Sequence, residues 1–302
     1  MLAAAAVLAG CLLLLAVAAP GLLARAAWPH SCPALALALW QALGLAGGLL
    51  AIEVAVTVAL APAGPSHLEA VRALRDGRVD AMPVWSGIAL GIGVLLLLRL
   101  LSVLLASTAG TLRARRDNRV LVDLVATRNP LLPDARVVEH ALPLAYCLPG
   151  LRPRVVVSSG VLSLLSDQEV RAVLAHERAH VDQRHDLVVL PFVALRDTFP
   201  VLPAVRTAVA QVGLLVEMLA DDRAARRHPP EVLARALYKV GAAPVPTGGL
   251  SAGGNGVLLR ARRLLEPPPA PALRVRVAAA SATAAVLALA PLGLLLPLLA
   301  PG

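Results

Sequence analysis

Residues 173–180 read Val-Leu-Ala-His-Glu-Arg-Ala-His, and this stretch decides how the rest of the chain is interpreted. It contains the pattern H-E-x-x-H, in which Glu177 stands between His176 and His180. A helix turns once in about 3.6 residues, so both imidazoles project from nearly the same face and can reach one metal ion. The glutamate can then deprotonate a water held at that ion. The pattern predicts a catalytic metal site, although two histidines around a glutamate can also lie on a solvated helix without any metal.

A second acidic pattern, E-x-x-x-D, lies within the predicted helix 204–227. Its two carboxylates, Glu217 and Asp221, are four residues apart and so share one helix face. Apolar residues on both sides of Glu217 draw its side chain towards the interior, where a carboxylate needs a partner such as a metal ion. Pairs at this spacing more often lie on solvated faces, and it is the upstream H-E-x-x-H that makes this one informative.

Together the two patterns predict one Zn²⁺ per chain, with His176, His180 and Glu217 as ligands. Two histidines and a glutamate leave one tetrahedral position open, which is typical of catalytic rather than structural zinc sites. Glu177 would be the general base, and Asp221 would accept a hydrogen bond from a ligand histidine and fix its tautomer.

Other side chains remain alternatives for this site. His185 is a fallback ligand, but from a regular helix it would point away from the other two histidines. His140, His228 and Tyr238 are candidates to stabilise an oxyanion, and the sequence does not choose among them. The edge of a predicted strand at 154–158 could pair with an extended peptide substrate.

The composition indicates a membrane protein. The chain has 302 residues, of which 58% are hydrophobic, and its mean hydropathy is +0.75. Soluble domains are usually about 45–50% apolar. The net charge of +9 comes mainly from arginines at the ends of apolar runs, which argues against direct nucleic-acid binding. Three unclustered cysteines argue against a disulfide framework.

Four apolar runs are long enough to cross a bilayer, at 2–24, 33–60, 82–107 and 277–299. The first lacks a basic leader, so we expect a retained helix rather than a cleaved signal peptide. The sequence predicts a mostly helical membrane protein with an α+β zincin-like metallopeptidase domain inserted between transmembrane helices. Its parts would be a membrane domain with three transmembrane helices at 1–110, the cytoplasmic metallopeptidase domain at 111–276 and a C-terminal transmembrane helix at 277–302.

The sidedness prediction rests on arginines that flank the polar region, because such clusters mark the cytoplasmic side. They are Arg113, Arg115, Arg116 and Arg119 after the third span, and Arg260, Arg262, Arg263, Arg274 and Arg276 before the fourth. We therefore expect a multi-pass protein of the bacterial inner membrane with both termini outside. The loop 63–83 would also lie outside, although it carries three arginines.

Two charged residues, Glu53 and Arg99, lie inside predicted spans. Intramembrane ionisable groups are candidates for function, and the alternative is a structural contact or snorkelling. Their depths differ by roughly 10 Å at the rise of a helix, so a direct pair is not expected.

Local patterns predict the elements of the polar region. We expect a helix at 119–127, strands at 135–140 and 154–158, and a turn at 148–150. Ser166 to Glu169 reads S-x-x-E, a capping box that starts the H-E-x-x-H helix, which would end near 185 or 186. The apolar stretch 187–203 is broken by prolines and would rest against the membrane or other helices, unless it is an ordinary buried connector.

The run Val155–Leu162, followed by the H-E-x-x-H stretch and then by Glu217 and Asp221, resembles membrane zinc metallopeptidases. The resemblance is to the BlaR/MecR type of bacterial β-lactam sensor-transducers, with HtpX-type proteases as relatives. It implies a gluzincin fold facing the cytoplasm and zinc endopeptidase activity, directed in the sensors at a transcriptional repressor. Since the sequence ends at Gly302, just after the last span, we expect it to lack the penicillin-binding sensor domain.

Three functions compete at this point. The first is a membrane zinc endopeptidase in regulated proteolysis or signal transduction, with a protein substrate such as a transcriptional repressor, and with membrane lipid around it. The second is an HtpX-like protease that clears damaged membrane proteins. The third is a catalytically inactive membrane signalling or scaffold protein. The presence of every expected zinc-site residue argues against the third.

Overall fold

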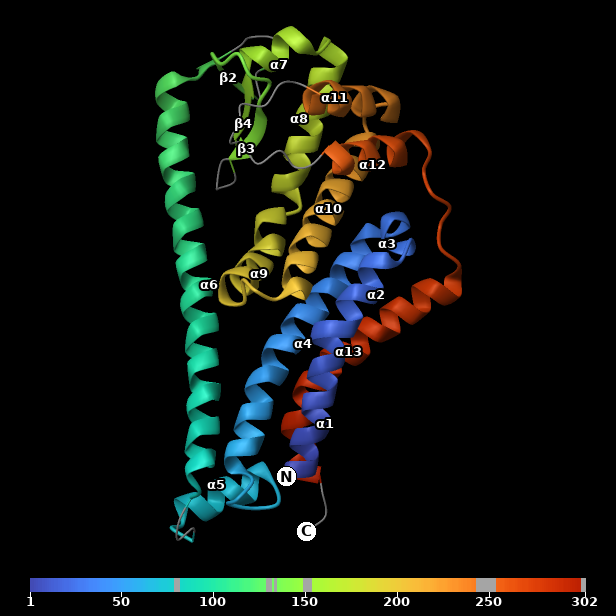
Figure 1. Ribbon diagram of the computed structural model, residues 1–302. Helices are drawn as coiled ribbons and strands as arrows, with labels where there is room; N and C mark the ends of the chain where they lie inside the picture. The colour runs from blue at the N-terminus through green and yellow to red at the C-terminus, as the bar shows by residue number, and fades with distance from the viewer. Residues whose placement is uncertain (79–81, 129–131, 133–134, 149–153, 243–253, 300–302) are drawn as a thin grey trace.

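The computed structural model describes residues 1–78, 82–128, 132, 135–148, 154–242 and 254–299. Long apolar helices form one end of the molecule, and a small sheet with shorter helices forms the other (Figure 1). The start of α1, the short helix α5 and the start of α6 all lie at the end away from the sheet. The predicted class, a small α+β region in a mostly helical protein with long apolar helices, is confirmed.

The apolar end of the molecule is built from long helices. Its elements are α1 (Leu2–Leu13), the π-helical turn η1 (Leu14–Ala18), α2 (Ala19–Arg25), α3 (Trp28–Ser31), α4 (Pro33–Leu60), α5 (His67–Arg75), α6 (Val84–Val125) and α13 (Leu273–Leu299). Helix α4 lies at the centre, and its buried side chains, among them Trp40 and Leu50, pack in one core with side chains of α1, α9 and α10.

Among the described residues, four helices are long and apolar enough to cross a membrane: Leu2–Arg25, Pro33–Leu60, Val84–Val125 and Pro203–Ala225. The first three contain the predicted spans. The fourth is α10, which lies within the predicted polar region and carries Glu217 and Asp221. The predicted span 277–299 falls within helix α13, but its side chains beyond 288 lie outside the described residues, so that span stays a prediction.

Helix α6 corrects the prediction of a separate helix at 119–127. It runs without a break from Val84 to Val125, through the predicted domain boundary at 110. The sequence changes from apolar to arginine-rich near Arg113, but a change of polarity does not end a helix when no proline or capping residue interrupts the backbone hydrogen bonds. One continuous helix therefore joins the apolar end of the molecule to the sheet.

The sheet has four strands in the order β1-β2-β4-β3: β1 (Thr127–Arg128), β2 (Ala135–Val138), β3 (Ala145–Leu148) and β4 (Arg154–Ser158). Strand β4 pairs with β2 in parallel and with β3 in antiparallel orientation. Both edges of β4 are thus occupied, and the prediction that its edge could pair with a substrate is wrong. Most of the predicted turn 148–150 lies outside the described residues.

The remaining helices surround the site: α7 (Ser159–Leu164), α8 (Asp167–Asp182), α9 (His185–Thr198), α10 (Pro203–Ala225), α11 (Pro230–Ala242) and α12 (Gly254–Leu265). The stretch 187–203 is largely helix α9, with Pro191 inside it. Its Phe192 is buried in the core formed with α4, and Gln41 of α4 donates a hydrogen bond to the Val188 carbonyl at 2.7 Å. Helices α9 and α10 therefore pack against each other and against α4. This contact agrees with a surface that rests on other helices, and the buried Phe192 agrees equally with a buried connector.

Candidate metal centre

Helix α8 begins where the sequence predicted. Ser166 accepts a hydrogen bond from the Glu169 backbone, and Glu169 Oε2 accepts one from the Ser166 backbone at 2.9 Å, so the capping box is confirmed. The helix ends at Asp182 rather than near 185, because Arg184 takes a left-handed conformation with φ of 49°. This break starts α9 at His185 and changes the direction in which the His185 side chain points.

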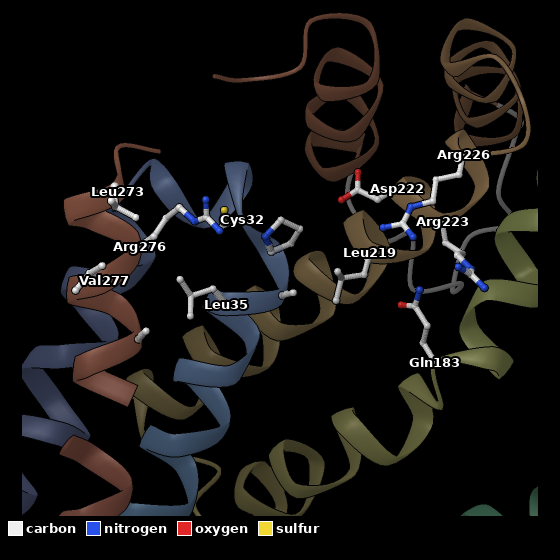
Figure 2. Close-up of a pocket in the computed structure, with 13 residues that line it drawn as sticks. Cys32, Leu35, Gln183, Leu219, Asp222, Arg223, Arg226, Leu273, Arg276 and Val277 are labelled. Carbon is white, nitrogen blue, oxygen red and sulfur yellow. The ribbon is translucent and has the colours of Figure 1, made fainter. Parts of the chain in front are cut away.

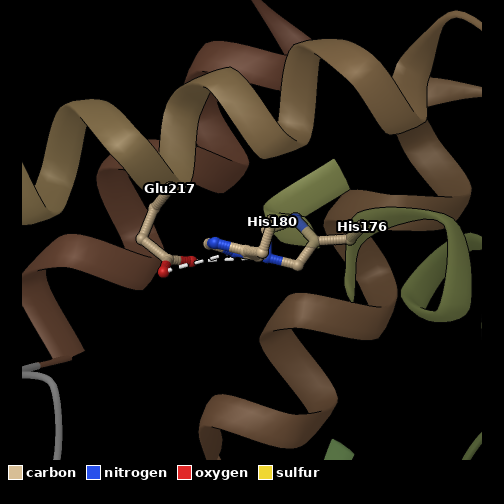
Figure 3. Close-up of side chains that lie close together, drawn as sticks. All are labelled: His176, His180 and Glu217. Carbon is tan, nitrogen blue, oxygen red and sulfur yellow. Dashed lines mark hydrogen bonds and ion pairs between the residues drawn. The ribbon is translucent and has the colours of Figure 1, made fainter. Parts of the chain in front are cut away.

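The three predicted ligands lie together between α8 and α10 (Figure 3). The Nε2 atoms of His176 and His180 are 3.2 Å apart. The Glu217 carboxylate lies with Oε2 at 3.4 Å from His176 Nε2 and Oε1 at 3.6 Å from His180 Nε2. Donor atoms of these residues all lie within 4.8 Å of one another, a grouping that could hold a metal ion.

These donor-to-donor distances fit a zinc ion. Zinc binds histidine nitrogen and carboxylate oxygen at about 2.0–2.2 Å, so ligands at the corners of a tetrahedron lie about 3.3–3.5 Å apart. The three observed separations, 3.2, 3.4 and 3.6 Å, fall around this range. Two imidazoles and one carboxylate also match the donor types that zinc prefers and leave a fourth position for water.

His185 lies behind His180 and not among the ligands. Its Nδ1 is 3.0 Å from His180 Nδ1, and its Nε2 is 2.8 Å from Gln183 Oε1. Because the amide oxygen only accepts, the His185 proton belongs on Nε2, and its Nδ1 accepts the Nδ1 proton of His180. This leaves a lone pair on His180 Nε2, the atom that faces Glu217 and His176.

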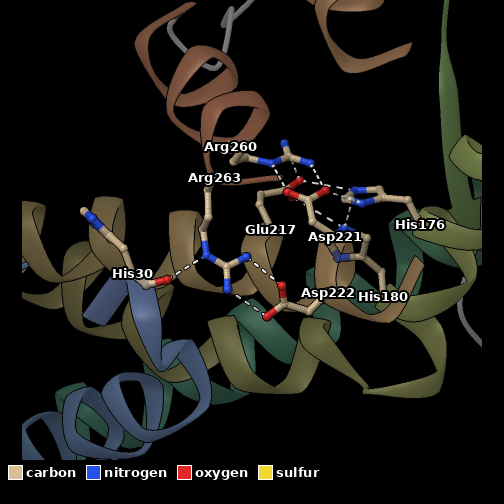
Figure 4. Close-up of polar contacts among 8 residues, drawn as sticks. All are labelled: His30, His176, His180, Glu217, Asp221, Asp222, Arg260 and Arg263. Carbon is tan, nitrogen blue, oxygen red and sulfur yellow. Dashed lines mark hydrogen bonds and ion pairs between the residues drawn. The ribbon is translucent and has the colours of Figure 1, made fainter. Parts of the chain in front are cut away.

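Asp221 and Arg260 complete the centre (Figure 4). Asp221 Oδ1 lies 3.0 Å from His176 Nδ1, as its predicted role requires, although the contact is not aligned as a hydrogen bond. Arg260, from α12, donates two hydrogen bonds to Asp221 at 2.7 and 2.8 Å, and its Nη1 lies 2.9 Å from Glu217 Oε2. Only 8% of Arg260 is exposed. This guanidinium balances two buried carboxylates, which would otherwise be costly to ionise.

The protonation of the two histidines differs in this arrangement. Burial alone would lower the pKa of His176, but the carboxylates of Asp221 and Glu217 outweigh it and raise this pKa to about 9. For His180, burial dominates and lowers the pKa to about 4. Metal binding at this centre therefore competes with a proton on His176.

Glu177 is the one acidic side chain of the cluster for which the described structure has neither a hydrogen bond nor an ion pair, whereas Glu217 and Asp221 both pair with Arg260. Burial raises its pKa to about 7; the Glu217 charge adds to this, while His176 and Arg260 oppose it. A carboxylate with such a pKa can both take up and release a proton near neutral pH, which is what a general base that later acts as an acid requires.

The remaining candidates lie elsewhere. His140 accepts a hydrogen bond from the Leu142 backbone in the connection before β3, Tyr238 is 59% exposed on α11, and His228 follows the end of α10. None of the three contacts the metal-ligand cluster in the described structure. Arg260 is the residue that sequence reasoning missed, since it had been counted only among the arginines that flank the last span.

The wide cavity beside α10 is a separate feature (Figure 2). It measures about 590 Å³ and is lined by residues of α10, α13 and the start of α4, including Arg223, Arg226 and Arg276. Leu219 and Arg226 lie on the face of α10 roughly opposite Glu217, at the helical repeat of about 3.6 residues. This cavity therefore does not open onto the three ligands.

Residues 111–238 match Peptidase family M48. The matched segment contains α8 and α10 with His176, Glu177, His180, Glu217 and Asp221, whereas Arg260 lies beyond it. No solved structure matches the chain significantly. Residues 111–238 are therefore similar to this metallopeptidase family, and the chain also has helices that are apolar enough to span a membrane.

Proposed function

We propose that this protein is a zinc-dependent endopeptidase of the bacterial inner membrane. The observation that carries the proposal is the convergence of His176 Nε2, His180 Nε2 and the Glu217 carboxylate at separations that suit tetrahedral zinc. The family match over 111–238 supports a metallopeptidase. The substrate would be a protein or peptide, and regulated proteolysis, for example of a transcriptional repressor, is the role that the resemblance to sensor-transducers favours.

The roles of the side chains follow from their positions. Zinc, when bound, supplies a Lewis acid that polarises a peptide carbonyl and makes a nearby water easier to deprotonate. Glu177 accepts the proton of that water on its carboxylate and later gives it to the leaving amine. His185 and Asp221 hold the rings of His180 and His176 through their Nδ1 atoms. Arg260 keeps Glu217 and Asp221 ionised and in place.

A substrate strand would pair with β3 rather than β4. Strand β3 stands at the end of the sheet order and contacts α8, which carries the H-E-x-x-H residues. An extended peptide added there would gain main-chain hydrogen bonds and run beside the catalytic helix. The Cys147 thiol on this strand is not a competing nucleophile, because burial raises its pKa to about 12 and it stays protonated.

The arginine distribution supports a cytoplasmic catalytic domain. The loop 63–83 would lie outside and carries three arginines, which runs against this distribution, but the effective positive charge of the loop is smaller than that count suggests. Arg75 and Arg78 both pair with Asp76, at 3.1 and 2.9 Å, so two of its positive charges are partly offset. Cysteine labelling beside Arg116 checks the orientation, and labelling by an impermeant reagent in intact cells would overturn it.

The experiment that tests the function compares protein N-termini, by mass spectrometry, in cells that express the wild type or Glu177→Ala. One or a few new termini that depend on Glu177 would support regulated proteolysis and name the target. Many such termini would instead favour quality control of membrane proteins. If none appears under several envelope stresses and the purified protein also lacks zinc, the inactive signalling or scaffold function replaces our proposal.

A further inference from the structure

Glu53 is a buried carboxylate that the catalytic centre does not use. It lies on α4, seven residues before the helix ends at Leu60, and only 8% of it is exposed. Neither of its carboxylate oxygens has a hydrogen-bond partner among the described residues. Arg99, the other charged residue inside a span, donates instead to the Asp197 carbonyl at 3.0 Å. An ionisable group in an apolar setting is costly unless something pairs with it.

This carboxylate lines a cavity of about 540 Å³ between α4, α5 and α13. The lining is otherwise almost entirely apolar: Leu45, Leu49, Ile52, Val56, Val71 and Leu287 are among its residues. Such a volume is within the range of about 300–1,000 Å³ that is typical of sites for small ligands. Leu45, Leu49 and Leu287 are exposed although they line the cavity, so the cavity is open to the surface of the apolar helices.

A second polar atom faces the same space. His67, the first residue of α5, lines the cavity, and its Nε2 lies 3.0 Å from the Thr57 hydroxyl. Its Nδ1 is buried and has no hydrogen-bond partner among the described residues. Helix α5 begins close to the end of α4 (Figure 1). The cavity therefore has an apolar body with two polar groups on its lining, and the Glu53 carboxylate and the Nδ1 atom of His67 have no hydrogen-bond partner among the described residues.

The chemistry of these groups selects the ligand. In the part of the chain that the structure describes, both oxygens of Glu53 are free to accept hydrogen bonds, and a cationic donor is the ligand group that pairs best with a carboxylate because it also offsets the charge. The apolar lining requires that the rest of the ligand be hydrocarbon. We propose that this cavity binds an amphipathic amine, whose ammonium group pairs with Glu53 and whose chain lies against the leucines of α4 and α13. The proposal does not depend on peptidase activity.

The test uses the full-length protein in lipid nanodiscs made of phosphatidylcholine and phosphatidylglycerol. The probe is a long-chain alkyl amine that carries a photoreactive diazirine, and its neutral twin is the alcohol of the same length. After irradiation, labelled peptides are mapped by mass spectrometry. We expect the amine to label α4 and α5 at least tenfold more than the alcohol does, and excess dodecylamine to abolish the labelling.

Two variants locate the site. Glu53→Gln keeps the size of the side chain and should reduce amine labelling at least tenfold, whereas the exposed Glu69→Gln on α5 should leave it unchanged. Leu49→Trp should fill the cavity and abolish labelling while Glu53 stays in place. This variant tests the site even if Glu53→Gln fails to fold. Zinc content and gel filtration check the fold of each variant.

The outcomes are distinct. Equal labelling by amine and alcohol, or unchanged labelling of folded Glu53→Gln, would overturn the proposal, because a bilayer lipid chain would then simply fill the space. A third arm replaces phosphatidylcholine with phosphatidylethanolamine. If this lipid suppresses the labelling, the occupant is the amine headgroup of a membrane lipid; if labelling persists, the occupant is a free amphipathic amine. Both results support the site.

Discussion

Helix α8 carries two glutamates eight residues apart, the buried Glu169 and the half-buried Glu177, and their surroundings are opposite. Burial raises the pKa of each carboxyl. At Glu169 this effect is outweighed by hydrogen bonds from Lys239 and Ser166, so that its pKa is lowered. At Glu177 the neighbouring positive charges do not compensate, and its pKa is raised to about 7. The same residue type on one helix therefore has its ionised form favoured at one position and is kept ready to exchange a proton at the other.

The difference shows how the structure separates stability from chemistry. The Glu169 carboxylate is fully paired: it accepts the capping-box hydrogen bond and lies 2.7 Å from Lys239 and 3.8 Å from Arg235. Both of its oxygens therefore already have partners, so neither is available for a ligand. Around Glu177, the histidine Nε2 atoms and the Glu217 carboxylate converge instead on one point. Perturbed pKa values and incomplete pairing in one cluster are typical of a functional site.

The largest expected effect comes from the unpaired glutamate. Glu177→Gln should lower the rate of peptide cleavage by about 10²–10⁴-fold, because the amide cannot accept a proton from water. Zinc content should be unchanged, since Glu177 is not among the three convergent side chains. The measurements are a cleavage assay on the substrate found by N-terminal mapping and zinc per chain by mass spectrometry. Full cleavage by the variant would remove Glu177 from the mechanism and with it the contrast with Glu169.

The second prediction concerns the residue that faces both histidines. Losing a residue that hydrogen-bonds to a metal ligand weakens metal binding by roughly 10–100-fold. Glu217→Gln removes a ligand itself, so it should weaken zinc binding by more than this. Asp222→Asn is the matched control, because Asp222 lies on the same helix but pairs with Arg263. Zinc per chain is measured after dialysis against graded chelator. If Glu217→Gln holds zinc as tightly as Asp222→Asn does, the convergence on α10 is not the metal site.

The sequence could predict those parts of the site that depend on spacing within one helix. His176 and His180, or Glu217 and Asp221, must share a face wherever α8 and α10 form. The position of His185 could not be predicted, since it depends on the left-handed Arg184 that ends α8. Arg260 reaches Asp221 from 39 residues away, and no local pattern encodes that contact. The interior position of β4 likewise depends on pairing with two other strands.

A smaller effect is expected from the ring behind His180. His185→Phe should keep the buried ring volume but remove the acceptor for the His180 Nδ1 proton, and zinc affinity should fall by about 10–100-fold. Cleavage should return when zinc is in excess. His228→Phe, a histidine outside the cluster, is the control. If His185→Phe loses zinc as completely as Glu217→Gln does, then His185 is itself a ligand and the tautomer argument is wrong.

The smallest effect, a change in stability, should come from substitution of Glu169, whose carboxylate is fully paired. Glu169→Gln keeps the capping box, because glutamine also serves at that position, and loses only the charge interaction with Lys239 and Arg235. Lys239 is 40% exposed, so solvent screening limits the loss in the free energy of unfolding to about 1 kcal/mol.

The folded-state pKa of Glu169 lies below its unfolded value. The wild type should therefore be more stable than the variant above that unfolded value, and the difference should disappear as the pH falls through the folded pKa. Hydrogen exchange of the first turns of α8, measured for both proteins across this range, checks it. A difference that grows on acidification would mean that Glu169 is protonated at neutral pH, and the two glutamates of α8 would then be alike.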